Sequence, residues 1–220
     1  MSDSQETAGT VDEPVDRRSM LGRMALGGGA VVAGAVGGVA ASASGVGASG
    51  WKREAVVFDV ACIGETWRES EALFAVNESD LRGRPFLVEG WVYPPGTIPT
   101  PGDGYVPTQD GSLGRWLCRG NVLLHPDRPE PHVVSVQEFV FAPMSGEQLF
   151  PDDLITTSGI EGTFATQQVA HRSIVGGTGQ YLGASGQQDQ SWNGFNTSVD
   201  AFGENAPNFV MTFDLLLPDL

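Results

Sequence analysis

The sequence predicts an almost entirely β-structured domain, a barrel or a sandwich, over residues 51–220. Eight segments rich in Val, Ile, Phe, Trp and Thr occur in this region. Clusters of Gly, Pro, Asn and Asp separate them at intervals typical of such folds. The composition, 40% hydrophobic and 18% charged, is that of a globular chain long enough for one core.

The first expected strand, EAVVFDVAC, is rich in β-branched residues, and the second, RPFLVEGWVY, alternates and ends at Pro-Pro-Gly. The fourth, HVVSVQEFVFA, is the strongest because Val and Phe recur on both of its faces. Only TWRESEALFAV (66–76) has a helical pattern, in which Thr66 and Glu69 could form a capping box. The strands are expected at 54–62, 84–93, 113–124, 132–142, 153–164, 167–175, 180–190 and 208–218.

Residues 1–50 are expected to be a signal peptide and a flexible N-terminal segment. Arg17 and Arg18 precede a weakly apolar run rich in Gly, Ala and Val, and A-x-A-like small residues follow. This order is typical of an export signal, and the paired arginines resemble a twin-arginine signal. The run is poorly hydrophobic for a permanent span, which favours cleavage over a membrane anchor. We therefore expect export through the twin-arginine pathway, to the cell envelope or beyond.

The charge balance is strongly acidic, with 12 basic and 27 acidic residues and a net charge of -15. This balance argues against nucleic acids and anionic membrane surfaces as partners, because both repel a negatively charged protein.

The stretch SIVGGTGQYLGASGQ (173–187) has glycine spacing like that of a nucleotide-binding loop. A phosphate-binding loop needs a helix after its glycines, and a helix here would contain Gly183 and Gly186. Each interior glycine would cost about 1 kcal/mol relative to Ala. A hairpin between two strands is therefore favoured, with Gly176, Gly177 and Gly179 as its structural turn residues.

The same stretch resembles the Gly-rich hairpin of the allene oxide cyclase and dirigent family of barrels. The segments GRPFLVEGWVYPPGT and GSLGRWLCRGNVLL resemble that family's second and third strands, and Cys118 matches a position often held by Cys. The segment VVSVQEFVFAPMSGEQLFPDDLITTSGI resembles its long hairpin, and FVMTFDLLLP resembles its closing strand. Together these matches cover most of residues 54–218.

The resemblance implies an eight-stranded antiparallel β-barrel with a hydrophobic cavity, often assembled as a homo-oligomer such as a dimer or trimer. Family members bind a small, reactive, mostly apolar intermediate and steer its cyclisation or coupling, with no metal and no organic cofactor. An eight-stranded barrel is the size that holds side chains or one small ligand. The sequence departs from the dirigent Ala-Arg-Gly triplet, which is Ala184-Ser185-Gly186 here.

Two carboxylates in apolar runs, Asp59 and Glu138, are the catalytic candidates. The resemblance implies an acid near the first strand, for which Asp59 is the nearest match and Glu65 the next. Alternation places Val57, Asp59 and Ala61 on one face. We expect this small, acidic face to line the cavity, where desolvation would raise the pKa of Asp59. Each acid could instead point outward to solvent or an arginine.

Other polar residues on the expected strands also have an inward and an outward alternative. Gln137 and Glu138 occupy opposite faces of one strand, so one of them should face the interior. The arginines Arg115 and Arg119 share a face and could pair with the acids across the sheet. Three further expectations concern polar side chains. Asp189 and Asn193 lie near a cavity mouth, His125 and His132 lie in an exposed Pro-rich turn without metal, and His171 faces a neighbouring polar group from its strand.

Large aromatic residues on strands or strand ends either line an apolar pocket or pack against neighbours, and the sequence favours the two alternatives equally. The Pro- and Gly-rich segment 94–111 is expected to form a lid or rim with Tyr105 at its tip. Trp192 belongs to the same aromatic set. The expected substrate-binding residues are Trp91, Tyr93, Trp116, Gln137, Phe139 and Tyr181.

The cysteines Cys62 and Cys118 lie on the first and third expected strands. A disulfide is possible in an exported protein, but two buried free thiols are favoured, because these strands need not bring the Cα atoms within about 7 Å.

Three functions fit the sequence. The first is an exported barrel that steers cyclisation, isomerisation or stereoselective coupling of a small apolar metabolite. The second is a non-catalytic carrier of such a molecule, and the third is an oligomeric structural or interaction barrel.

Overall fold

The structure, a computed structural model, describes residues 50–70, 82–123, 132–141, 153–161 and 168–219. The expected signal segment therefore lies outside the described residues. In the described part of the chain, no helix is both long and apolar enough to span a membrane.

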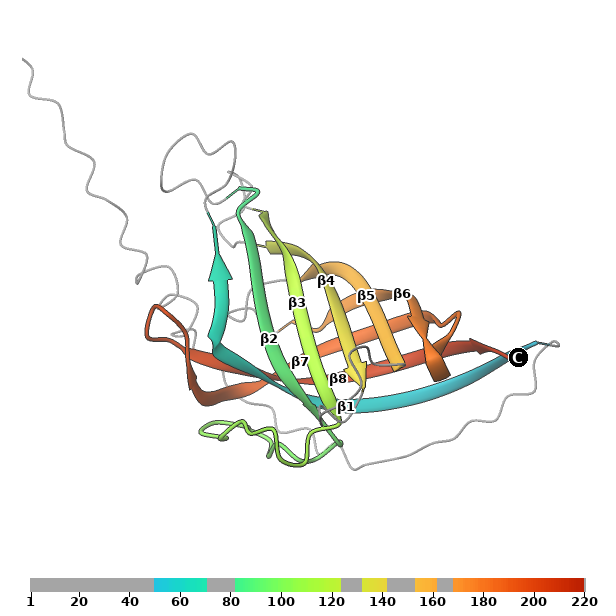
Figure 1. Ribbon diagram of the computed structural model, residues 1–220, viewed down its shortest axis with the longest axis horizontal. Coiled ribbons are helices and arrows are strands. Elements are labelled where there is room, and N and C mark those ends of the chain that lie inside the picture. Colours follow the sequence, from blue (N-terminus) through green and yellow to red (C-terminus); the bar gives the residue numbers. More distant parts are fainter. Residues whose placement is uncertain (1–49, 71–81, 124–131, 142–152, 162–167, 220) are drawn as a thin grey trace, which may run out of the picture.

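The eight strands form one closed antiparallel barrel, in which each strand pairs with the next and the last pairs with the first (Figure 1). This confirms the fold class expected from the sequence. A short 3-10 helix, η2 (Gly179–Tyr181), lies between the sixth and seventh strands. The strands are β1 (Trp51–Glu69), β2 (Pro85–Tyr93), β3 (Gly114–Leu123), β4 (His132–Phe141), β5 (Asp153–Glu161), β6 (Ala170–Thr178), β7 (Ser185–Val199) and β8 (Asn205–Pro218).

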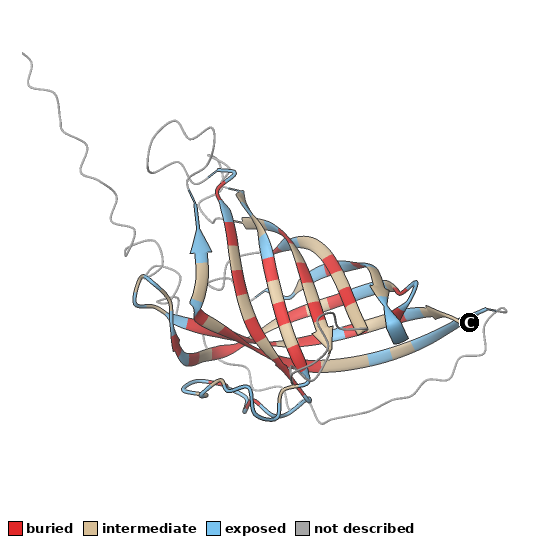
Figure 2. Ribbon diagram, viewed as in Figure 1, coloured by how far each residue is buried: buried red, intermediate tan, exposed pale blue. Residues whose placement is uncertain are grey.

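Burial alternates along the strands, so that buried and less buried residues form bands across the barrel wall (Figure 2). In β4, for example, Ser135, Gln137 and Phe139 are buried, whereas Val136 and Glu138 are partly exposed. The alternating set that faces inward forms the core. Its apolar members include Phe58, Val60, Cys62, Val88, Val92, Trp116, Cys118, Phe139, Ile155, Ile174, Phe209, Met211, Phe213 and Leu215.

Thr66 and Glu69 belong to β1, so the expected capping box at the start of a helix over 66–76 is wrong. The pairing of β1 with β2 shifts register between Ile63 and Arg68. The Thr66 hydroxyl accepts a hydrogen bond from the Glu89 backbone N–H at 2.9 Å and donates one to the Ile63 carbonyl at 2.6 Å. The side chain thereby replaces pairing that the bulge removes. Residues 71–76 lie outside the described residues.

The Gly-rich stretch does form a hairpin, which connects β6 to β7. Gly176 and Gly177 lie within β6, and the tight turn begins at Gly179, where φ is +59°. Gly186 lies in β7 with φ of +126°, and a Cβ atom there would come within 2.0 Å of the Asp214 carbonyl oxygen. Of the three expected turn glycines, Gly179 lies in the turn, whereas Gly176 and Gly177 belong to the strand before it. The predicted hairpin is confirmed, and Gly179 and Gly186 serve backbone geometry.

The loop between β2 and β3 folds against the outer wall of the barrel rather than over its interior. Asn193 donates to the Pro99 carbonyl at 3.0 Å, and Asn208 donates to the Gly102 carbonyl at 2.9 Å. A second, smaller core forms beneath the loop. Its members are Ala61, Tyr93 and Ile98, with Trp91 and Tyr105 packed against them.

Candidate functional site

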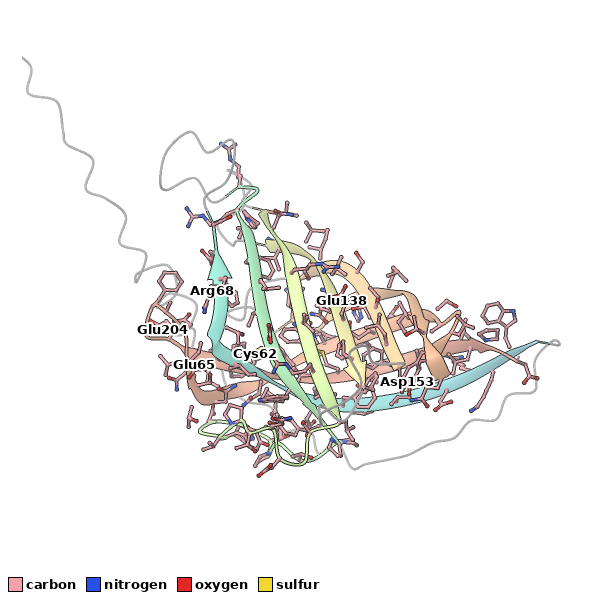
Figure 3. The ribbon with its side chains drawn as sticks, viewed as in Figure 1. Cys62, Glu65, Arg68, Glu138, Asp153 and Glu204 are labelled. Atoms are coloured by element: carbon pink, nitrogen blue, oxygen red, sulfur yellow. The ribbon has the colours of Figure 1, made fainter. Side chains whose placement is uncertain are left out.

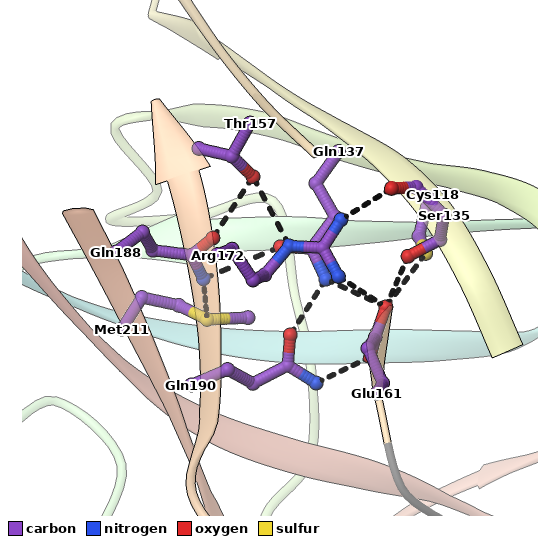
Figure 4. Close-up of polar contacts among 9 residues, drawn as sticks. All are labelled: Cys118, Ser135, Gln137, Thr157, Glu161, Arg172, Gln188, Gln190 and Met211. Atoms are coloured by element: carbon purple, nitrogen blue, oxygen red, sulfur yellow. Dashed lines mark hydrogen bonds and ion pairs between the residues drawn. The ribbon is translucent and has the colours of Figure 1, made fainter. Parts of the chain in front are cut away.

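A group of side chains joined by polar contacts lies inside the barrel, where most neighbours are apolar. We call it the interior polar cluster (Figure 4). Six strands contribute to it, β3 to β8. Its members are Cys118, Ser135, Gln137, Thr157, Glu161, Arg172, Gln188, Gln190 and Met211.

The carboxylate of Glu161, at the end of β5, is the centre of this cluster. Arg172 Nη1 lies 2.7 Å from Glu161 Oε1, and the Arg172 and Glu161 side chains are only 0% and 9% exposed. The Ser135 hydroxyl donates to the same oxygen, as does Gln137 Nε2 at 3.3 Å. Gln190 Nε2 donates to Oε2 at 2.8 Å. The carboxylate is thus compensated both by an opposite charge and by several donors.

The guanidinium of Arg172 is held by β4 and β5. Its Nη2 donates to the Ser135 carbonyl at 2.8 Å, and its Nε donates to the Thr157 hydroxyl at 3.2 Å. Thr157 in turn donates to Gln188 Oε1 at 2.9 Å. Because three of its nitrogens have fixed partners, the arginine has one defined position inside the barrel.

The glutamines of the cluster are linked to one another. Gln137 Nε2 donates to Gln190 Oε1 at 2.6 Å, and Gln188 Nε2 lies 3.3 Å from Gln137 Oε1. Gln188 Nε2 also lies 3.0 Å from the Met211 sulfur. The result is a continuous network that crosses the interior from β4 to β8.

Aromatic rings fill the part of the interior toward the β6–β7 hairpin. The ring centroid of Phe213 lies 5.6 Å from that of Phe58 and 4.9 Å from that of Phe139, and both pairs meet edge to face. The ring centroid of Phe141 lies 5.0 Å from that of Phe58 and 5.4 Å from that of Tyr181. The interior therefore combines an aromatic region with a charged, hydrogen-bonded one.

Four of the expected substrate-binding residues lie in this interior. Trp116, Gln137 and Phe139 are fully or almost fully buried, and Tyr181 packs on Phe141 from η2. Burial raises the pKa of the Tyr181 hydroxyl above its usual value.

Asp59 does not face the interior, and the expected placement on the cavity wall is wrong. The inward face of β1 carries Phe58 and Val60, which belong to the main core. Asp59 is buried on the opposite face, beneath the β2–β3 loop, where its Oδ2 accepts the Ile98 backbone N–H at 2.9 Å. Burial raises the pKa of this carboxyl, and backbone hydrogen bonds from the loop oppose the shift. The Asp59 carboxylate therefore anchors the loop through this hydrogen bond.

Two further candidates, Glu138 and Trp91, also lie on the outer wall. Glu138 pairs with Arg119 at 2.6 Å, the outward alternative that the sequence left open. Trp91 lies under the guanidinium of Arg115, 4.5 Å from its ring centroid, and Arg115 pairs with Glu89. Because these residues face outward, none of them can touch a molecule held inside the barrel.

Tyr93 is buried on the outer wall as well, in the small core beneath the β2–β3 loop. Its ring meets Tyr105 edge to face at 5.8 Å. Its hydroxyl accepts the Thr108 backbone N–H at 3.0 Å, and burial raises its pKa. The loop with Tyr105 therefore covers the wall of the barrel.

Other expected residues have structural partners. His171 faces Asp189 across β6 and β7, with Nδ1 and Oδ1 2.7 Å apart, as expected for a strand histidine with a polar neighbour. This pair faces solvent, so Asp189 is not at an interior mouth. His132 begins β4, and His125 lies outside the described residues. Across the described ranges, no group of three or more His, Cys, Asp or Glu residues is arranged to hold a metal ion.

Glu65 lies where β1 bends, next to β7 (Figure 3). The Ser198 hydroxyl donates to its Oε2 at 2.5 Å, and this hydrogen bond lowers the pKa of the carboxyl.

Both cysteines are free and buried, which confirms the favoured expectation. Both strands that carry them pair with β2, so one strand separates Cys62 from Cys118. Burial raises the pKa of each thiol well above its usual value. Cys118 Sγ lies 3.8 Å from Glu161 Oε1, at the edge of the interior polar cluster.

Sequence reasoning did not single out Glu161 and Arg172, the charged pair at the centre of the site. The sequence holds a signal for Arg172 but not for its pairing with Glu161. Arg172 alternates with Ala170 and Ile174 in β6, so the apolar members of that face indicate an inward arginine.

The fold is similar to solved structures of dirigent proteins. The pterocarpan synthase dirigent protein PsPTS1 matches with a TM-score of 0.50 and 14% identity, over 76% of this chain and 96% of that chain. The pterocarpan synthase dirigent protein GePTS1 matches with a TM-score of 0.50 and 16% identity, over 79% and 94%. These matches establish a dirigent-like barrel. No protein-family model matches the sequence, and the search of curated proteins found no significant match.

Proposed function

We propose that this barrel binds a small, largely apolar molecule in its interior and steers its cyclisation, isomerisation or stereoselective coupling. The observation that carries the proposal is the buried pair of Arg172 and Glu161 within an otherwise aromatic and aliphatic interior. The dirigent-like fold supports it, because an eight-stranded barrel has room for side chains or one small ligand.

The energetic argument concerns the position of that pair. Removing two charges from water costs several kcal/mol per ion, and a well-packed apolar replacement is often as stable or more stable. The pair is therefore a poor means of stabilising the barrel. Fixed charges and oriented amides in a dry interior can, however, stabilise charge that develops on a bound molecule.

The chemical role proposed for the cluster is electrostatic and positional. Glu161 already accepts from Arg172, Ser135 and two glutamines, so the network holds it as an acceptor. Arg172 would steady partial negative charge on a ligand oxygen, while the aromatic side chains hold one conformer and exclude water. These residues replace Asp59 and Glu138, which lie on the outer wall, in the proposed site.

A non-catalytic carrier is the second candidate, and the outward position of Asp59 favours it. Asp59 is the acid expected to act on a molecule inside the barrel, and it lies outside. A carrier needs no such acid, because it only has to enclose its ligand. Carrier and catalyst differ in whether the bound molecule changes.

The test uses the full chain and a panel of apolar compounds that carry a reactive alkene, epoxide or phenol. Compounds that raise the melting temperature are incubated with wild type and with the Arg172→Met/Glu161→Leu double variant. Chiral chromatography then measures product and its stereochemical excess. A catalyst gives an excess that the double variant loses while binding persists. Binding without any product in wild type would leave the carrier, and no binding would overturn both.

We also propose export through the twin-arginine pathway, which the order of Arg17, Arg18, the weakly apolar run and the small residues supports.

A further inference from the structure

Two indole N–H groups inside the barrel have no hydrogen-bond acceptor among the residues that the structure describes. They belong to Trp116 and Trp192, and both Nε1 atoms are buried. Trp116 as a whole is only 2% exposed. Buried donors are almost always paired in native proteins, so two orphans in one barrel require an explanation.

Both indoles are on the inward face and both neighbour Phe209. The ring centroids of Trp116 and Phe209 are 6.2 Å apart. Trp192 stands directly opposite Phe209 in the β7–β8 pairing, and it packs against the same core. Residues directly opposite in an antiparallel pair share a face, so the Trp192 side chain is inside the barrel with Phe209.

Three close neighbours of Trp116 are apolar. Its register partners are Gly90 on β2 and Phe139 on β4, and Phe209 lies against its ring. None of these three residues offers a side-chain acceptor to the indole. A buried water usually makes about three hydrogen bonds, and these neighbours supply no side-chain partner for one.

We propose that the indole N–H groups of Trp116 and Trp192 are the donors that position the ligand, and that this ligand is a neutral, mostly apolar molecule with a carbonyl oxygen. The proposal rests on the proposed function, since it names the chemical class bound in that interior. A carbonyl oxygen bound against the indoles supplies the acceptor that they lack.

The neutrality of the ligand follows from the charges already present. Arg172 and Glu161 pair with each other at 2.7 Å, so the described interior cluster carries no net charge from this pair. An indole N–H is a neutral donor, and burying an unpaired ion costs far more than burying a carbonyl that accepts a hydrogen bond.

The experiment compares two probes of nearly the same shape, 9-fluorenone, which has a carbonyl, and fluorene, which has none. Equilibrium dialysis with the full chain measures both dissociation constants in wild type, Trp116→Phe and Trp192→Phe. The matched control is Trp91→Phe, which alters an indole on the outer wall. We expect each interior substitution to weaken fluorenone binding about threefold to tenfold and to leave fluorene within twofold, as for one lost hydrogen bond. The control should change neither.

A second measurement needs no variant. In wild type labelled with ¹⁵N-tryptophan, fluorenone should shift two indole N–H resonances downfield, and fluorene should not. Fluorenone affinity that is unchanged in both interior variants, or equal weakening of both probes, would overturn the donor assignment and leave the proposed function intact. Failure of wild type to bind either probe would overturn the ligand class proposed here, whereas the proposed function is tested separately by the panel of alkenes, epoxides and phenols.

Discussion

Arg172 on β6 and Glu161 on β5 form an ion pair of 2.7 Å inside the barrel, with the arginine side chain fully buried. Removing one partner leaves the other charge buried without compensation, whereas removing both removes the desolvation cost as well. This asymmetry allows the pair to be tested separately from ligand binding.

We therefore expect Arg172→Met to destabilise the barrel by about 3–5 kcal/mol, the typical cost of breaking a buried pair. The double variant Arg172→Met/Glu161→Leu should recover most of that loss. Urea unfolding of the full chain measures both. The control is Arg119→Met, which breaks the exposed pair with Glu138 and should cost less than about 1 kcal/mol. A double variant less stable than the single one would contradict the argument.

Asp59 gives a prediction about pH, because burial raises its pKa in the folded protein. Folding then favours the protonated carboxyl, so its contribution to stability is present at acid pH. It is lost as the pH rises from the usual carboxyl range through the raised pKa. Relative to Asp59→Asn, wild type should become less stable across this window, as followed by melting temperature.

The control for that measurement is Glu138→Gln, which removes a carboxylate on the outer wall and leaves Asp59 in place. A wild-type curve parallel to that of Asp59→Asn at all pH values would show that the Asp59 pKa is not raised by folding.

The sequence predicts which face of a strand points inward only where that strand buries one face and exposes the other. Alternation and turn residues identify the strands, because most strands bury one face and expose the other. β1 is different: Phe58 and Val60 face the main core, and Ala61 is covered by the β2–β3 loop. With both faces buried, alternation does not identify the inward one, which is why Asp59 was assigned to the wrong side.

The candidate site was predicted only in part for a similar reason. Trp116, Gln137 and Phe139 are expected substrate-binding residues and lie in the interior, but the sequence alone left open which of Gln137 and Glu138 faces inward. The pairing of Arg172 with Glu161 depends on strand register, and no local pattern encodes it. An arginine in a short alternating segment is ordinarily read as an outward residue.

Because both thiols are buried, we expect them to react slowly with thiol reagents in the native protein. Because burial shields Cys62 and Cys118 and raises the pKa of both, little thiolate is available to react. Ellman's reagent should label neither thiol rapidly in the native protein and both in urea. Reduction should leave the intact mass unchanged. An increase of about 2 Da, the mass of the two hydrogen atoms gained when a disulfide is reduced to two thiols, would contradict the free state.

Export is tested at the two arginines. Replacing Arg17 and Arg18 with Lys should leave the precursor in the cytoplasm of a bacterium that has the twin-arginine pathway, because that route reads the paired arginines. Fractionation and immunoblotting measure this. A matched control replaces Arg23 with Lys, outside the pair. Unchanged export of the paired variant would remove the basis of the proposal.

Gly186 offers a prediction that separates backbone strain from a steric clash. Its φ of +126° is unfavourable for any residue with a Cβ atom, and that atom would come within 2.0 Å of the Asp214 carbonyl oxygen on β8. Gly203 also has a positive φ, +85°, but a Cβ atom there would meet nothing within 4 Å. Gly203→Ala should therefore cost about 1 kcal/mol, the strain alone. Gly186→Ala should cost several kcal/mol more in urea unfolding, because β7 and β8 must separate where they pair. Equal losses for the two variants would mean that β8 yields at Asp214 and that close contact there does not hold the barrel closed.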